Sequence, residues 1–183
     1  ESIENTTYEL LFINDGSSDH TEDLIKLMAH KNKQCFYYSF SRNFGKEAAM
    51  YAGLENATGD YVVIMDADLQ HPPYLLKEMY RSLKEENYDC SAGKRIDRTG
   101  EGKLRNFLSH SFYKVIQTLT KMDMDDGAGD FRMMTRQMVD AILELKEYNR
   151  YMKGLFSFVG FNTKWLEFHN VERQGGNTKW SFK

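Results

Sequence analysis

Short apolar runs alternate with amphipathic stretches along the first half of the chain. The candidate β-strands are residues 8–13, 35–40, 61–65 and 88–92. The candidate helices are residues 21–30, 44–56 and 74–86, the last of which is preceded by Pro72 and Pro73. Strands joined by helices are usually parallel, so this pattern predicts an α/β fold with a mostly parallel sheet flanked by helices.

The second half of the chain has a different pattern. Apolar residues recur at helical spacing over residues 104–119, and again, with many aromatic rings, over residues 148–161. Both apolar faces are expected to pack on the sheet, although an aromatic-rich face flanked by Lys and Arg also suits a membrane interface. Residues 163–171 alternate and predict a further strand. No linker interrupts the sequence, so residues 1–183 are expected to form a single domain.

The composition narrows the class of protein. A net charge of −3, from 24 basic and 27 acidic residues, excludes a polycationic nucleic-acid binder, so any anion site must be local. Cys35 and Cys90 cannot build a disulfide framework, which indicates a reducing, cytoplasmic environment. The apolar runs are far shorter than the ~20 residues that a membrane-spanning helix requires.

The strongest candidate site follows the strand at residues 61–65, where the chain reads Asp66-Ala67-Asp68-Leu69-Gln70. Ligands of open α/β sheets bind beyond the carboxyl ends of the strands. Two carboxylates and an amide oxygen supply the hard ligands that Mg²⁺ or Mn²⁺ prefers, and they leave room for substrate phosphates. The alternative is that these carboxylates cap the next helix. His71 is expected to be a loop residue rather than a metal ligand.

Two polar loops follow earlier strands. The turn Asn14-Asp15-Gly16-Ser17 could hold a nucleoside, or it could be a plain loop in which Ser18 or Asp19 caps the next helix. In the second loop, Arg42 and Lys46 could meet phosphate beside Gly45. A basic stretch lies further along the chain and comprises Lys94, Arg95, Arg98, Lys103 and Arg105, opposed by Asp97 and Glu101.

Taken in order, these motifs and the later segments DDGAGDFRMMTR and RQGGNTKW resemble the family-two inverting glycosyltransferases of the GT-A fold, which is Rossmann-like. The resemblance is greatest to their polyprenyl-phosphate branch, which includes dolichol-phosphate mannose synthase and bactoprenol glucosyltransferase. It implies transfer of a sugar, with inversion, from a UDP- or GDP-sugar to undecaprenyl or dolichyl phosphate at the cytoplasmic face of the membrane. It also implies Mg²⁺ or Mn²⁺ as the cofactor.

The resemblance assigns roles residue by residue. The metal ligands are Asp66, Asp68 and Gln70, the nucleotide-binding residues are Asp15, Gly16, Ser17 and Asp66, and the catalytic residues are Asp68 and Asp130. The phosphate-binding residues are Lys46, Arg95, Arg105, Ser109, Arg132, Arg173 and Lys179, of which Arg95, Arg105 and Ser109 match residues that hold the acceptor phosphate. Asn14 stands where the family usually has Asp, and Thr178 stands where it more often has Ser.

Family members begin with a further strand that forms part of the nucleotide pocket, and the polyprenyl branch continues into membrane-spanning helices. The chain is therefore expected to be truncated at both ends relative to the family, with the first strand absent and the full-length protein membrane-anchored. Two alternatives stay open. One is a glycosyltransferase that acts on a saccharide or protein hydroxyl, with Asp130 as its base, and the other is an inactive nucleotide-binding or interaction module. A homo-oligomer also stays open, and the sequence does not identify the sugar or the base.

Overall fold

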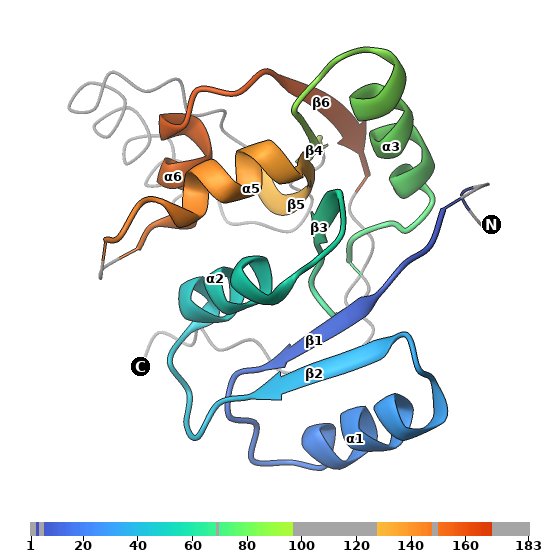
Figure 1. Ribbon diagram of the computed structural model, residues 1–183, viewed down its shortest axis with the longest axis vertical. Helices are drawn as coiled ribbons and strands as arrows, with labels where there is room; N and C mark the ends of the chain where they lie inside the picture. Colours follow the sequence, from blue (N-terminus) through green and yellow to red (C-terminus); the bar gives the residue numbers. More distant parts are fainter. Residues whose placement is uncertain (1–2, 4–5, 69, 97–127, 148–149, 170–183) are drawn as a thin grey trace. The chain divides into compact units, whose positions relative to one another are not determined.

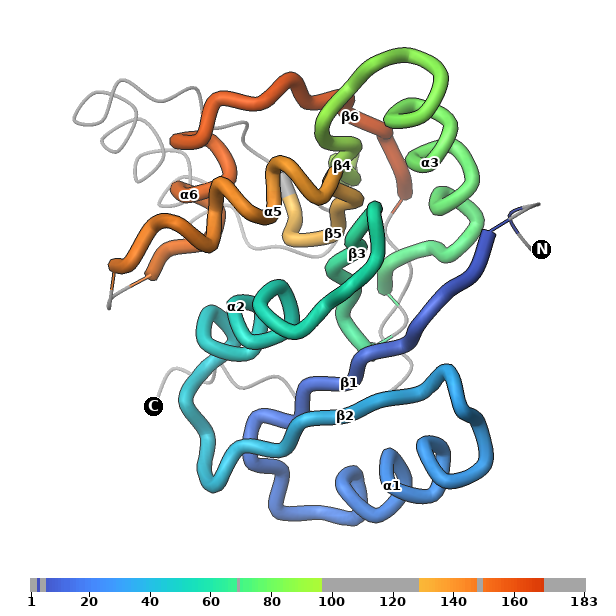
Figure 2. Tube along the Cα trace, viewed as in Figure 1, coloured from blue at the N-terminus to red at the C-terminus, as the bar shows by residue number. Residues whose placement is uncertain are grey.

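The computed structural model describes residues 3, 6–68, 70–96, 128–147 and 150–169 (Figure 1). The chain forms two compact units, one comprising residues 1–62 and 135–159 and the other residues 63–134 and 160–183. Figure 2 traces the path of the chain through them. We call them unit 1 and unit 2 and describe each by itself.

The described residues of unit 1 form a small parallel sheet and four helices. Its elements are β1 (Leu10–Asn14), α1 (Thr21–Lys31), β2 (Cys35–Ser39), α2 (Lys46–Asn56), α5 (Arg136–Leu143) and α6 (Met152–Phe158). β1 pairs with β2 in parallel, with Leu10 opposite Cys35 and Asn14 opposite Ser39. A helix connects the two strands, as the alternating pattern predicts for parallel neighbours.

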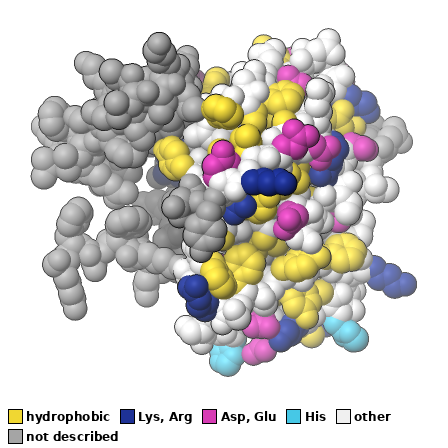
Figure 3. All heavy atoms as spheres, turned by 60° about the vertical axis from the view of Figure 1, so that its left-hand side comes forward, with side chains coloured by type: hydrophobic (Ala, Val, Ile, Leu, Met, Phe, Trp, Pro, Cys, Tyr) yellow, Lys and Arg dark blue, Asp and Glu magenta, His cyan; other side chains and the backbone are white. Residues whose placement is uncertain are grey.

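The buried side chains of unit 1 come mainly from α2, α5 and α6. They include Met50, Leu54, Met138, Val139, Ile142, Met152 and Phe156. By contrast, α1 has no buried residue, and its Leu24 side chain is 60% exposed. Figure 3 shows hydrophobic side chains reaching the surface among charged ones on one face of the molecule. The strand β2 also carries exposed apolar side chains, namely Phe36, Tyr37 and Tyr38.

Unit 2 is built on a mixed sheet. β3 (Tyr61–Ile64) crosses the boundary from unit 1, and the other elements are α3 (Leu75–Glu85), β4 (Cys90–Arg95), β5 (Ala128–Thr135) and β6 (Thr163–Phe168). The strand order is β3-β5-β4-β6, and β4 is parallel to β6 but antiparallel to β5. Its core includes Leu75, Met79, Leu83, Phe131, Met133, Met134, Leu166 and Phe168.

The structure confirms the α/β class and the strands and helices expected in the first half of the chain, with bounds that shift by a few residues. One mostly parallel sheet was the expectation, but the described strands form two sheets, because β1 pairs only with β2 among them. β5 and α5 were not expected. The helix expected at residues 104–119 lies outside the described residues, and the single-domain assignment stays a prediction.

The aromatic stretch at residues 148–161 contains α6, which buries Met152 and Phe156 and leaves Phe158 60% exposed. Part of this apolar face is therefore buried inside unit 1, in line with the expectation that it packs within the protein. None of the helices formed by the described residues combines the length and the apolar character needed to cross a bilayer.

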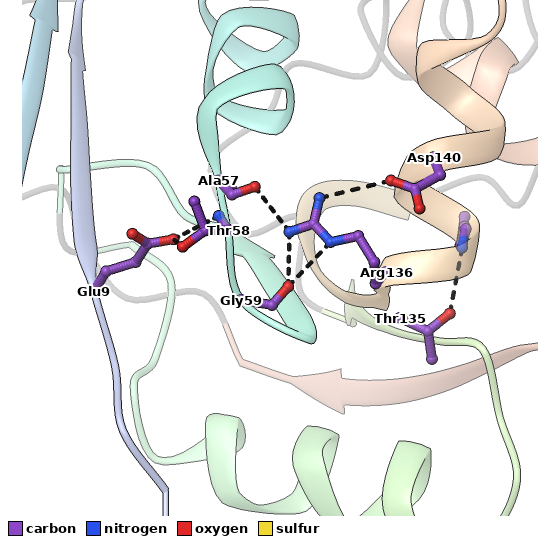
Figure 4. Close-up of polar contacts among 8 residues, drawn as sticks. Glu9, Ala57, Thr58, Gly59, Thr135, Arg136 and Asp140 are labelled. Carbon is purple, nitrogen blue, oxygen red and sulfur yellow. Dashed lines mark hydrogen bonds and ion pairs between the residues drawn. The ribbon is translucent and has the colours of Figure 1, made fainter.

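Arg136 fixes the turn between α2 and β3 to the start of α5 (Figure 4). Its guanidinium donates to the carbonyl of Ala57 at 2.9 Å and to that of Gly59 at 2.7 Å. On the same turn, the carboxylate of Glu9 accepts a hydrogen bond from the backbone N–H of Thr58 at 2.7 Å. The side chain of Thr135 caps α5 by accepting from the N–H of Met138 at 3.4 Å.

Replacing Arg136 by alanine should lower the free energy of unfolding by about 1.5–3 kcal/mol, because two carbonyls lose a charged donor. Asp140→Ala is the matched control, since Asp140 lies 3.8 Å from Arg136 and is 60% exposed. A surface pair of this kind contributes about 0–1 kcal/mol. Urea unfolding of both variants would measure the difference, and equal losses would contradict the role assigned to Arg136.

Gly16 should tolerate no side chain. Its φ is +64°, and a Cβ atom there would lie 2.4 Å from the carbonyl carbon of Arg42. Gly16→Ala should therefore destabilise the protein by about 1–3 kcal/mol. Gly53→Ala in α2 is the control, because its Cβ would lie at an ordinary 3.5 Å from Ile13 and alanine favours a helix. Thermal unfolding should separate the two variants, and a neutral Gly16→Ala would contradict the geometry.

Candidate active site

The acidic loop that follows β3 is held by hydrogen bonds within unit 2. Asp66, Asp68 and Gln70 are all partly exposed. One carboxylate oxygen of Asp68 accepts from the backbone N–H of Gln70 at 3.1 Å, and the backbone N–H of Asp66 donates to Nδ1 of His71 at 3.0 Å. Tyr74 occupies the N-cap position of α3, so the alternative in which the two carboxylates cap that helix is wrong.

The donor set of this loop fits a hard divalent cation. Among the described residues, no cluster of three or more His, Cys, Asp or Glu side chains is arranged to hold a metal by itself. Mg²⁺ and Mn²⁺ sites of phosphate-transferring proteins often use only one or two carboxylates, and substrate phosphate and water complete the shell. Asp66 and Asp68, with the amide oxygen of Gln70, match that requirement.

Strand β5 carries two further predicted site residues, Asp130 and Arg132. Arg132 is 4% exposed, and its guanidinium donates to the carbonyl of Gly129 at 2.9 Å. Burial lowers the pKa of Arg132, although the neighbouring Cys90 and Asp130 act in the opposite direction. This burial favours a structural role for Arg132 over the predicted phosphate contact. Asp130 is partly exposed, and its catalytic role stays a prediction.

In unit 1, Asp15 joins two loops that the sequence presents separately. Its carboxylate accepts hydrogen bonds from the backbone N–H groups of Phe44, at 2.7 Å, and Gly45, at 3.1 Å. The side chain of Asn43 donates to the carbonyl oxygen of Asp15 at 3.2 Å. The turn at the end of β1 and the loop that leads into α2 are therefore fastened together through Asp15. Its assignment to the nucleotide stays a prediction.

The neighbours of Asp15 explain how the turn is shaped. Asn14 is 3% exposed, and its amide accepts from the N–H of Ser17 at 3.1 Å and donates to the hydroxyl of Ser39 at 3.3 Å. An amide can do both, whereas the carboxylate more usual in the family can only accept. Further along, Asp19 accepts from the N–H of Thr21 at 3.0 Å, and hydrogen bonding to Thr21 lowers the pKa of Asp19. The N-cap of α1 is nevertheless His20, so the alternative in which Ser18 or Asp19 caps this helix is wrong.

Lys46 is the first residue of α2 and is exposed, next to Gly45, which has a φ of +98°. Its position at a helix start suits an anion contact.

Glu47, the residue after Lys46, has a structural role. Its carboxylate accepts a hydrogen bond from the backbone N–H of Met152 at 2.7 Å and so connects α2 to α6. Sequence reasoning gave Glu47 no role, and no local pattern would have revealed a contact between residues so far apart in the chain.

Several predicted phosphate ligands lie outside the described residues. These are Arg105, Ser109, Arg173 and Lys179. Arg95 is described and is the last residue of β4, where it pairs with Phe168 of β6. The assignments of these five residues all stay predictions.

The structure also reveals a residue that sequence reasoning did not place in the site. His71 is 6% exposed and stacks on the ring of Phe131, with ring centroids 4.9 Å apart. The sequence offered only a weak signal for this arrangement, namely a histidine between an acidic loop and two prolines. The stack links the acidic loop to the strand that carries Asp130 and Arg132.

Comparison with known proteins identifies the family. Residues 1–143 match Glycosyl transferase family 2. A putative glycosyltransferase of Bacillus subtilis, CsbB, is 50% identical over 175 residues, which cover 96% of this chain and 53% of the relative. A bactoprenol glucosyl transferase of Shigella phage SfX is 37% identical over 181 residues, which cover 99% of this chain and 59% of the relative. The chain thus spans little more than half the length of these relatives.

Solved structures support the same fold at low sequence identity. A mannosyltransferase from Pyrobaculum calidifontis, in complex with GDP-Man and Mn²⁺, matches with a TM-score of 0.57 at 18% identity and covers 90% of this chain and 47% of its own. Glucosyl-3-phosphoglycerate synthase from Mycobacterium tuberculosis matches with a TM-score of 0.53 at 18% identity, covering 92% of this chain and 62% of its own. These neighbours confirm the expected GT-A-like fold. With a family match over residues 1–143, the chain belongs to glycosyl transferase family 2.

Proposed function

We propose that the protein is an inverting glycosyltransferase that moves a sugar from a nucleotide diphosphate sugar to a polyprenyl phosphate. The observation that carries this proposal is the loop from Asp66 to Gln70, which presents two partly exposed carboxylates after β3 in a family 2 chain. Relatives named bactoprenol glucosyl transferase support a polyprenyl phosphate as the acceptor.

The donor would be held through its diphosphate and its nucleoside. Asp66, Asp68 and Gln70 would hold Mg²⁺ or Mn²⁺, and a solved neighbour in complex with GDP-Man and Mn²⁺ supports this. When bound, such an ion stabilises the charge that develops on the leaving diphosphate. The turn that contains Asp15 would contact the nucleoside, and Lys46 would contact phosphate.

The transfer itself is a displacement at the anomeric carbon. An ionised oxygen of the lipid phosphate forms the new C–O bond on the face opposite the diphosphate. The old C–O bond breaks, and its electron pair leaves with the diphosphate oxygen, so the configuration inverts. A phosphate oxygen is largely ionised at neutral pH and needs no general base, so Asp130 would position the sugar or an arginine. A hydroxyl acceptor would instead require Asp130 as the base.

The acceptor would meet a set of basic residues. Arg95, Arg105 and Ser109 would bind the lipid phosphate, because Arg matches phosphate geometry with two parallel hydrogen bonds. If residues 104–119 are helical, as expected, Arg105 and Ser109 share one face. Arg173 and Lys179 would close over the donor phosphates. Since the acceptor is a lipid, the reaction would take place at the membrane surface, on the cytoplasmic side.

Binding of the donor should depend on a divalent ion. Asp66→Asn and Asp68→Asn should each weaken Mn²⁺-dependent binding of UDP-glucose or GDP-mannose at least about tenfold, because each removes one of few protein ligands. Isothermal titration of both donors, with Mn²⁺ and with EDTA, would measure this. Asp140→Asn on α5 is the control and should bind as the wild type does. Donor binding that is unchanged in EDTA would remove the metal from the proposal.

The acceptor assignment predicts a different effect. Arg105→Ala should cost about 1.5–3 kcal/mol, or roughly 10- to 150-fold in transfer to a short-chain polyprenyl phosphate, because a charge-assisted hydrogen bond is lost. Donor affinity should barely change. Arg81→Ala is the control, since Arg81 is a 56% exposed arginine of α3.

Asp130→Asn distinguishes the two kinds of acceptor. If the acceptor is a lipid phosphate, adding Arg105→Ala to Asp130→Asn should weaken transfer by the same factor as Arg105→Ala does in the wild type. Full transfer by Arg105→Ala, together with activity on a sugar hydroxyl that Asp130→Asn abolishes, would favour the hydroxyl acceptor. A wild-type protein that binds donor but neither transfers nor hydrolyses it would instead be an inactive nucleotide-binding module.

A further inference from the structure

His71 lies at the junction between the acidic loop and helix α3. Pro72 and Pro73 follow it, and their carbonyls accept from the N–H groups of Leu75 and Leu76 at 3.2 and 3.1 Å. These contacts start α3, whose Leu75 is 5% exposed. The chain on the C-terminal side of His71 is therefore anchored in the core of unit 2.

On its N-terminal side, His71 holds the main chain of the acidic loop. Nδ1 of the imidazole accepts the N–H of Asp66 at 3.0 Å, five residues earlier in the chain. Because Nδ1 is the acceptor, the proton of the neutral ring sits on Nε2. A second bond, from the N–H of Gln70 to Asp68, shapes the loop from within. The two bonds together restrict the backbone at both carboxylates.

The imidazole is itself held by an aromatic stack. Its plane lies 9° from that of Phe131, which is fully buried and packs edge-on against Phe168 at 6.3 Å between centroids. Phe131 stands between Asp130 and Arg132 on β5. The stack therefore fixes the plane of the His71 ring, and the hydrogen bond from Asp66 selects the ring orientation in which Nδ1 faces the loop.

We propose that His71 is a positioning residue for the acidic loop, which uses its Nδ1 acceptor to hold the Asp66 backbone where the two carboxylates can share one divalent ion. This inference rests on the proposed function as far as the metal is concerned. The rival explanation is that His71 only packs in the core of unit 2. The two differ in which part of the ring matters, namely the acceptor atom or the stacked surface.

Two substitutions separate these parts. His71→Asn places an amide oxygen near the position of Nδ1 but lacks the stacked ring, whereas His71→Phe keeps a stacked ring and lacks the acceptor. If His71 positions the loop, His71→Phe should weaken Mn²⁺-dependent binding of UDP-glucose or GDP-mannose by about 10- to 100-fold, the range seen for residues that orient metal ligands. His71→Asn should stay within about threefold of the wild type.

Hydrogen exchange at the Asp66 amide gives a readout that needs no metal. The amide should be protected in the wild type and in His71→Asn, and it should exchange at least about tenfold faster in His71→Phe. If His71→Phe does not fold, His71→Gln replaces it, because its acceptor sits near the position of Nε2 and should not reach Asp66. The same loss of protection is expected.

The outcomes are distinct. Weakened donor binding in His71→Asn with unchanged binding in His71→Phe would mean that His71 only packs. Equal weakening in both variants would also overturn the proposal, because the acceptor that His71→Asn retains would then make no difference. If the wild type shows no Mn²⁺-dependent donor binding, the proposed function fails in its metal component. The exchange measurement then still decides whether His71 holds the loop, and a protected Asp66 amide in His71→Phe would show that it does not.

Discussion

Backbone groups in the loops at the strand ends need hydrogen-bond partners, and side chains from elsewhere in each unit supply them. Loop backbone cannot pair within a helix or a sheet, and an unpaired buried N–H or C=O group is costly. Asp15 serves the N–H groups ahead of α2, His71 serves the N–H of Asp66, and Arg136 serves two carbonyls between α2 and β3. These three side chains hold the candidate-site loops and the turn between α2 and β3.

This constraint bears directly on chemistry. A carboxylate binds a cation with little reorganisation only when its backbone is already in place. In unit 2, the stack of His71 on Phe131 connects the acidic loop to β5. In unit 1, the carboxylate of Asp15 accepts hydrogen bonds from the backbone N–H groups of Phe44 and Gly45. A residue that looks like a ligand in the sequence can thus serve mainly to fix the loop around the ligand.

Charge raises a second requirement. The chain is acidic overall, with a net charge of −3, yet the proposed donor and the proposed acceptor are both anionic. Cations must therefore be concentrated locally, through a divalent ion and through arginines and lysines. Arg132 is poorly suited to bind an anion, because its side chain is buried and donates to the carbonyl of Gly129. The exposed Lys46 at the start of α2 is better placed for contact with an anion.

The sequence by itself determined the α/β class, the early strands and helices, and the family, because periodicity and motif order are local properties. It also located the acidic loop. It missed β5, whose Gly129, Asp130 and two methionines have little strand preference, since pairing with β4 makes that segment a strand. It missed α5, although Thr135 and the apolar spacing after it were a readable signal. Only the tertiary structure decided the partners of Asp15 and His71, because a side chain's hydrogen bonds depend on which distant backbone groups the fold brings within about 3 Å.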